Sequence, residues 1–113
     1  MSKVYVVVAR GDNGAEWIED YAEFTINIAV FTSKDLAEAF LKYPPALEEA
    51  CIKHGVIVAD ENVNFEKAVN WIEDTDGNTI LETDNGWFSF TVKFRIEEFE
   101  LGEYEVKEEE HDG

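Results

Sequence analysis

The chain has 113 residues, of which 26 are Asp or Glu and 9 are Lys or Arg, so its formal net charge at pH 7 is −17. A hydrophobic share of 45% and an aromatic share of 13% indicate a folded globular domain rather than a disordered chain. The length allows one domain with one core, and the charge excludes nucleic acids and anionic membranes as direct partners because they repel an acidic surface.

The cellular setting follows from the cysteine count and the first residues. Cys51 is the one cysteine and cannot form an internal disulfide. Met1, Ser2 and Lys3 lead directly into strand-like residues without the pattern of a signal peptide, and no apolar run approaches the roughly 20 residues that span a bilayer. We therefore expect a cytoplasmic protein without a membrane partner.

The first thirty residues predict two strands. Residues 4–9 are apolar at both parities, which predicts a strand buried on both faces. Residues 10–14 predict a turn. The Arg-Gly-Asp triplet within it is interpreted as a chance match to an integrin-binding motif. Residues 15–21 have no clear periodicity. In residues 24–30 large apolar residues alternate with Thr25, Asn27 and Ala29, which predicts a second strand antiparallel to the first.

Two helices are expected next. Thr32 or Ser33 is the predicted N-cap of a helix whose apolar residues follow a helical spacing up to residue 41. Pro44 and Pro45 end it, and Pro45 fits the first turn of a second helix.

That second helix is predicted to run to His54, with Gly55 as its C-terminal stop. Residues 56–59 then predict a short buried strand, and residues 65–72 fit either a helix or a segment that ends as a strand.

The last third predicts a meander of strands. Asp76-Gly77 and Asn85-Gly86 are strong hairpin signals on either side of a strand at residues 79–82. Residues 87–101 form a long alternating strand, and a shift of apolar parity near Glu97 and Glu98 predicts a bulge.

These elements predict an α+β fold, as a single domain over residues 1–106. We expect a mainly antiparallel sheet with two or three helices packed on one face, followed by a disordered acidic tail at residues 107–113.

Catalytic and metal sites are not indicated. Cys51 and His54 are three residues apart on one helix, but a small buried thiol and a helix-terminal imidazole explain them better than a nucleophile with its base. Asp74 and Asp76 only faintly resemble a calcium loop, because the other ligand positions fail. We therefore expect no enzyme, no catalytic residue, no metal and no cofactor.

Carboxylates are the feature that points to a function. The last seventeen residues hold nine acids against Lys107, and further acids lie in the predicted folded part. A regular array of carboxylates on a folded surface can occupy a DNA-binding groove, using the ion pairs that the groove makes with phosphates. The other interpretation is a solvated acidic face. The predicted partner-binding residues are Glu97, Glu98, Glu100, Glu103, Glu105, Asp60, Glu61, Asp74 and Asp76.

Three segments resemble a group of small, uncharacterised bacteriophage proteins. They are a Lys-Val-Tyr-Val-Val strand at residues 3–7, an Ile-Ala-Val-Phe strand with a capped helix at residues 28–40, and an acidic-aromatic strand at residues 96–101. In composition, the chain is also similar to phage-type DNA mimics. The resemblance implies a bacterial host cell and a role against host proteins or host defence, and it implies no activity.

The predicted function is a non-enzymatic acidic inhibitor that blocks a basic, nucleic-acid-binding host protein. One alternative is an inhibitor or adaptor that uses an apolar patch or a sheet edge, with Trp17 or Trp87 as an exposed aromatic and the charge only for solubility. A second alternative is a small-ligand protein that holds a nucleotide through cations. The sequence leaves the oligomeric state open, a dimer included.

Overall fold

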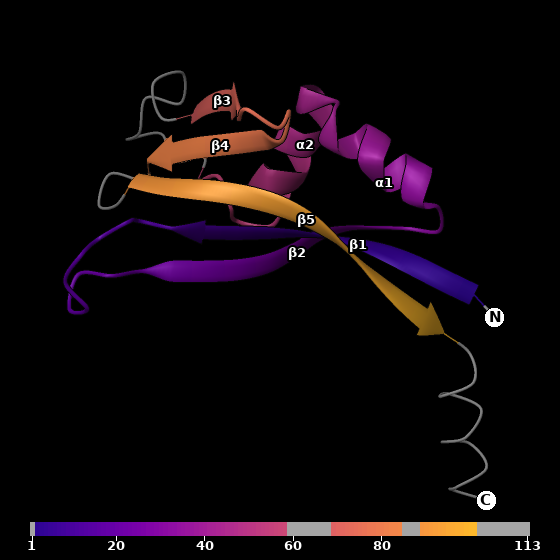
Figure 1. Ribbon diagram of the computed structural model, residues 1–113, viewed down its shortest axis with the longest axis horizontal. Coiled ribbons are helices and arrows are strands. Elements are labelled where there is room, and N and C mark those ends of the chain that lie inside the picture. Colours follow the sequence, from indigo (N-terminus) through magenta and orange to yellow (C-terminus); the bar gives the residue numbers. More distant parts are fainter. Residues whose placement is uncertain (1, 59–68, 85–88, 102–113) are drawn as a thin grey trace, which may run out of the picture.

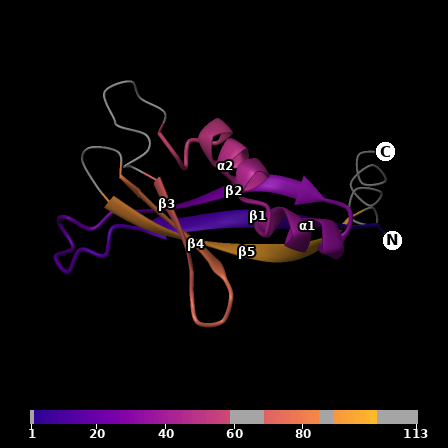
Figure 2. The same cartoon turned by 90° about the horizontal axis from the view of Figure 1, so that it is seen from above.

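The computed structural model describes residues 2–58, 69–84 and 89–101. The strands of these ranges form one antiparallel sheet in the order β2-β1-β5-β4-β3, and both helices cover the same face of it (Figures 1 and 2). The elements in chain order are β1 Ser2–Asp12, β2 Glu23–Phe31, α1 Lys34–Leu41, α2 Pro44–Lys53, β3 Val69–Glu73, β4 Thr79–Asp84 and β5 Ser89–Leu101. The predicted single α+β domain is confirmed, while its predicted end at residue 106 and the tail beyond it lie outside the described residues.

β1 is an inner strand between β2 and β5, and it is buried on both faces as its sequence predicts. Val7 and Ala9 belong to the core under the helices, and both are fully buried. Val6 and Val8 alternate with them and therefore lie on the uncovered face, yet they are only 8% and 1% exposed. β2 and β5 flank β1 on both sides, so neighbouring side chains shield this second row.

The turn predicted at residues 10–14 begins later than expected. Arg10, Gly11 and Asp12 continue β1 and stay paired with both β2 and β5. Gly11 is buried and faces the ring of Phe24, which leaves no space for a side chain. The Arg-Gly-Asp triplet is therefore part of a strand, and its glycine serves packing.

α1 begins where its cap was predicted. Ser33 is the N-cap, and its hydroxyl oxygen accepts a hydrogen bond from the backbone N–H of Leu36 at 3.4 Å. Asp35 lies in the first turn, where a carboxylate complements the helix dipole.

α2 also follows the sequence prediction at both ends. Pro44 and Pro45 occupy its first two positions, where a missing N–H costs no helical hydrogen bond. Gly55 has φ +79°, so it ends the helix in a conformation that glycine adopts readily.

The strand predicted at residues 56–59 is wrong. Val56 and Ile57 are buried, but their N–H groups donate to the carbonyl of Cys51 at 2.8 and 3.1 Å. The two residues thus close the C-terminal turn of α2 and do not pair with a strand. Residue 59 lies outside the described residues.

The hairpin predicted at Asp76-Gly77 connects β3 and β4. Gly77 has φ +84°, and its N–H donates to the carbonyl of Asp74 at 3.0 Å. The sequence predicts either a helix or a strand end for residues 65–72. Residues 69–72 are in β3, so the strand prediction is confirmed for this half, and residues 65–68 are not described. Asn85-Gly86 also lies outside the description, between two strands that pair antiparallel.

The bulge predicted at Glu97 and Glu98 is wrong. The β1–β5 register runs without a shift from Ser2↔Leu101 to Asp12↔Thr91. The irregularity lies between β1 and β2, where Val7 pairs with Ala29 and Val8 with Asn27, so that the buried Ile28 between them is the extra residue. The parity shift in β5 instead leaves Phe99 47% exposed.

The core lies between the helices and the sheet. Its fully buried members come from three strands and both helices: Val7, Ala9, Ala37, Leu47, Cys51, Leu81 and Val92. The aromatic pairs Phe24–Phe90, Phe31–Phe40 and Trp71–Phe94 pack around it, with ring centroids 5.2 to 6.1 Å apart. Neither described helix is long and apolar enough to cross a membrane.

Candidate functional site

The acidic residues of β5 are partly neutralised within the protein. The Arg95 guanidinium donates to Glu97 at 2.8 Å, and Glu98 forms an ion pair with Lys3 at 3.6 Å. Alternation along β5 places Glu97 on the uncovered face, whereas Glu98 and Glu100 share the opposite face. The three carboxylates therefore do not form one row. Glu100 is exposed, and it is the one of the three that forms no ion pair with another described residue.

The two acids of the β3–β4 turn have different roles. Asp74 Oδ1 accepts hydrogen bonds from the N–H groups of Asn78 and Asp76 at 2.8 and 2.9 Å, and its Oδ2 accepts one from the Asn78 side chain at 3.2 Å. These bonds, above all the one from the Asn78 backbone, lower the pKa of Asp74. Asp74 therefore builds the turn, and Asp76 is the exposed acid that a partner could meet.

A hollow lies between α1, the β3–β4 turn and β5. Its volume is about 320 Å³, at the lower end of the range for small-molecule pockets. Thr79 donates a hydrogen bond to the carbonyl of Leu41 at 3.2 Å and so connects the turn to α1. The lining residues are Glu38, Leu41, Lys42, Gly77, Asn78, Thr79, Phe94, Arg95 and Ile96. The described acids Asp76 and Glu97 are adjacent in sequence to this lining, whereas Asp60, Glu61, Glu103 and Glu105 lie outside the described residues.

The thiol does not form a nucleophilic site. Cys51 is fully buried in the core, and burial together with the nearby Glu48 carboxylate raises its pKa to about 12. Since the thiolate is the reactive form, the thiol is inert at neutral pH. Within the described ranges, no group of three or more His, Cys, Asp and Glu side chains could hold a metal ion.

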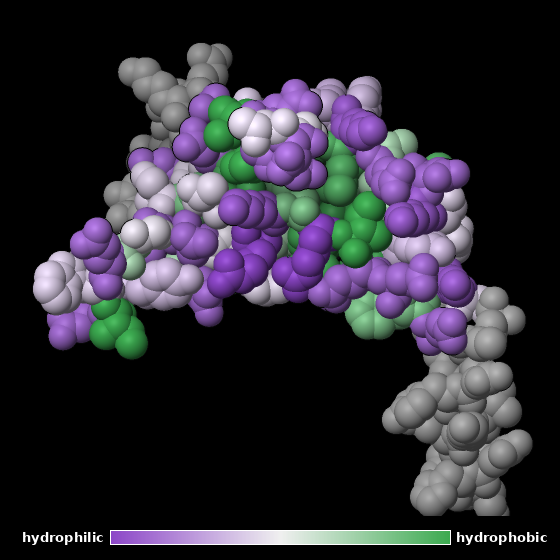
Figure 3. Space-filling view, in the orientation of Figure 1, coloured by the Kyte–Doolittle hydropathy of each residue, from purple (hydrophilic) through white to green (hydrophobic). Residues whose placement is uncertain are grey.

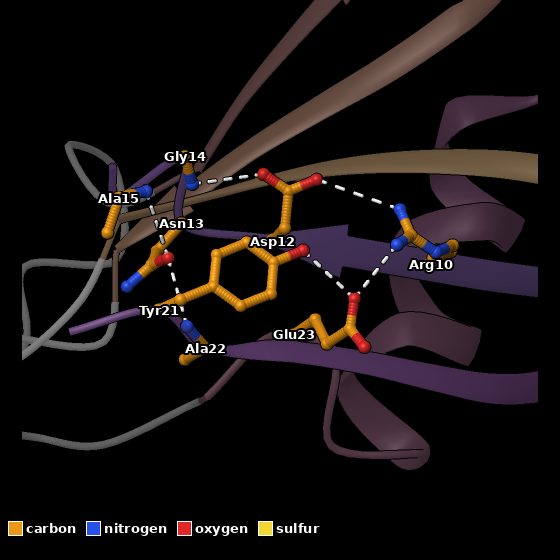
Figure 4. A network of polar contacts seen from close by, with 8 residues as sticks. All are labelled: Arg10, Asp12, Asn13, Gly14, Ala15, Tyr21, Ala22 and Glu23. Atoms are coloured by element: carbon orange, nitrogen blue, oxygen red, sulfur yellow. Dashed lines mark hydrogen bonds and ion pairs between the residues drawn. The ribbon is translucent and has the colours of Figure 1, made fainter. Parts of the chain in front are cut away.

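The β1–β2 loop is ordered by the side chain of one asparagine, although residues 15–21 gave no pattern in the sequence. Asn13 Oδ1 accepts hydrogen bonds from the N–H groups of Ala22 and Ala15 at 3.0 and 3.2 Å (Figure 4). Asn13 Nδ2 donates to the carbonyl of Asp20 at 2.7 Å. The Asn13 N–H donates to the Ala22 carbonyl at 3.1 Å. The two ends of the loop are thereby joined.

A second cluster supports the base of the same loop. Arg10 donates to Glu23 at 2.8 Å and lies 3.7 Å from Asp12, while the Tyr21 hydroxyl donates to Glu23 at 2.9 Å (Figure 4). The hydrogen bond to the Glu23 carboxylate is the main cause that raises the pKa of Tyr21. Two adjacent hydrophobic residues, Trp17 and Ile18, lie at the end of this supported loop and are 74% and 89% exposed.

Comparison with protein-family models, with curated proteins and with solved structures gave no match.

Proposed function

We propose that the protein is a non-enzymatic acidic binder that inhibits a basic, nucleic-acid-binding protein by occupying its nucleic-acid site. The observation that carries the proposal is the placement of the carboxylates. None of the 17 described Asp and Glu residues is buried, and the described ranges hold only seven Lys and Arg to neutralise them. Within the described ranges, exposed or half-buried carboxylates therefore outnumber the cations by ten, 17 against 7.

Such a surface suits a basic groove for physical reasons. Ion pairs with lysine and arginine release the counterions of both surfaces, as nucleic-acid binding does, and the attraction speeds the encounter at low salt. The sheet holds part of this charge in fixed positions, since residues two apart on one face of a strand are about 6.6 Å apart. Glu98 and Glu100 are such a pair.

Partner capture tests the proposal. The immobilised protein is exposed to a bacterial lysate, since the resemblance to phage proteins favours a bacterial target, and bound proteins are eluted with salt or duplex DNA and identified. We expect a basic nucleic-acid-binding protein that DNA displaces and whose affinity falls by orders of magnitude between about 50 and 200 mM salt. A specific partner that resists both salt and DNA would overturn the proposal.

Two charge-reversal variants test whether position matters. Glu100→Lys combined with Asp76→Lys reverses two exposed acids, one on β5 and one in the β3–β4 turn, and Glu48→Lys combined with Glu49→Lys makes the same change of net charge on α2. If the β5 side faces the partner, the first pair weakens binding more than the second. Equal tolerance of both pairs would favour a role in solubility alone.

A second candidate function is the binding of a small anionic ligand in the hollow. The observation that favours it is the pair of cations Lys42 and Arg95 in the lining, although Arg95 already binds Glu97. A panel of nucleotides tests it by thermal unfolding, because a ligand at 100 times its dissociation constant adds about 2.7 kcal/mol of stability. If no nucleotide of the panel raises the unfolding temperature, the hollow does not bind a ligand of this class.

A further inference from the structure

The end of the β1–β2 loop exposes large hydrophobic side chains between acidic ones. Trp17 and Ile18, 74% and 89% exposed, are the two most exposed of the large hydrophobic residues in the described ranges. Glu16, Glu19 and Asp20 flank them and are exposed as well. We call residues 16–20 the Trp17 tip. Figure 3 shows a hydrophobic group at this end of the molecule within a largely hydrophilic surface, and Figures 1 and 2 show the loop extending beyond the helices.

The tip is held in shape before any partner arrives. Asn13 binds three backbone groups of the loop, and Asp20 N–H donates to the Trp17 carbonyl at 3.0 Å across the tip itself. Association is opposed by the entropy lost when flexible side chains and loops become ordered. A pre-ordered loop has already lost much of that entropy, which is the property of a binding anchor.

The charge around the tip selects the kind of partner. Tryptophan is enriched at the centres of protein interfaces, where it fills a desolvated pocket within a polar rim. Three carboxylates at residues 16, 19 and 20 form the rim here, so the complementary surface carries lysine or arginine. A nucleic acid or an anionic membrane would be repelled, and a second copy of a chain with net charge −17 would be repelled too.

We propose that the Trp17 tip anchors the protein to its partner by inserting Trp17 and Ile18 into an apolar pocket rimmed by basic side chains on another protein. The choice of a basic protein rests on the function proposed above. The new element is that affinity comes from an apolar anchor at the hairpin end, while the distributed carboxylates mainly set the rate of encounter and its salt dependence.

The test uses a phage-displayed library of random peptides that is selected on the full chain alone, and each selected peptide is then tested against the double variant Trp17→Ala/Ile18→Ala. Selected peptides are synthesised, and their binding is measured by fluorescence anisotropy. We expect peptides with an aromatic or aliphatic residue between lysines or arginines. Their affinity for the double variant should fall by at least about 30-fold, the size of a hot-spot contact.

The matched control is Leu36→Ala/Ile52→Ala, which removes two exposed hydrophobic residues from the helices. It should leave peptide affinity within about twofold, because surface changes away from a hot spot have little effect. Unfolding temperatures of both variants check that each keeps its fold. Peptides that bind the tip variant as tightly as the parent chain, or that lack basic residues, would overturn the proposal.

Two further results separate the possibilities. If the parent chain, but not the tip variant, binds vesicles of zwitterionic phosphatidylcholine, the tip is a membrane anchor and the proposal is wrong. If the tip variant loses the captured basic protein while that protein ignores duplex DNA, the anchor is supported and the nucleic-acid site of the proposed function is not. The two proposals can therefore fail separately.

Discussion

Replacing Gly11 by alanine is expected to destabilise the protein, although glycine weakens a strand in general. A Cβ atom on Gly11 would lie 2.5 and 2.6 Å from Cζ and Cε2 of Phe24 and 3.1 Å from Cγ2 of Val92. Carbon atoms in good contact are about 3.5–4.0 Å apart, so the Phe24 ring must move by about an ångström. The ring cannot turn aside without disturbing its T-shaped packing with Phe90, whose ring centroid is 5.3 Å away.

The sign of the effect follows from two opposing terms. Alanine restricts the unfolded chain and stabilises a suitable site by about 0.4–1 kcal/mol. Overpacking a filled core costs about 1–3 kcal/mol, and weakening an aromatic pair costs up to about 1.5 kcal/mol more. The second term is larger, and we expect the free energy of unfolding to fall by about 1–2 kcal/mol.

Thermal unfolding followed by circular dichroism measures this change. A loss of 1 kcal/mol lowers the Tm of a domain of this size by about 4–8 °C, so a decrease of several degrees is expected. The matched experiment introduces Gly11→Ala into a Phe24→Leu background, where the clash with the ring is gone and the cost should drop by more than half. A Tm that rises, or an equal cost in both backgrounds, would refute the packing argument.

Two more predictions concern titratable groups. Because the Cys51 thiol is buried with a pKa raised to about 12, we expect iodoacetamide to label it in the urea-unfolded chain and not in the folded one; rapid labelling of the folded protein would contradict its place in the core. Asp74 has a lowered pKa in the folded protein, so its stabilisation is present above the ordinary carboxyl pKa and is lost as pH falls through the folded value. Asp74→Ala should therefore reduce stability at pH 7 more than at pH 3. Asp76→Ala removes a side chain without a hydrogen bond to a described residue, so it should not reduce stability more at pH 7 than at pH 3. Urea unfolding at the two pH values measures both variants. Equal pH profiles of the two variants would count against the role of Asp74 in the turn.

The strands and helix ends were predictable because their signals are local. The alternation in β5, the N-cap at Ser33, the prolines at the start of α2 and the hairpin at Asp76-Gly77 each depend on a few neighbouring residues. The wrongly predicted strand at residues 56–59 lies where backbone N–H groups could bond either to a neighbouring strand or to the end of a helix. Val56 and Ile57 read as a buried strand, yet their N–H groups are taken by the end of α2.

The candidate sites were less predictable than the fold. A run of acids in the sequence does not show which acids the folded chain pairs with its own cations, as Arg95 does with Glu97 and Lys3 with Glu98. Lys3 and Glu98 are brought within 3.6 Å by the antiparallel β1–β5 ladder. The sequence predicts an exposed Trp17 only within one alternative among several.

By itself, the sequence determined the charge, the fold class and most elements, because composition and short-range periodicity carry that information. The tertiary structure alone decided the strand order, the extra residue at Ile28, the packing of Phe24 over Gly11 and the separation of the β5 acids onto two faces. It also decided that Trp17 and Ile18 remain outside the core, since Asn13 holds the loop through contacts between residues up to nine positions apart. Burial is a property of the whole folded chain, and no local pattern specifies it.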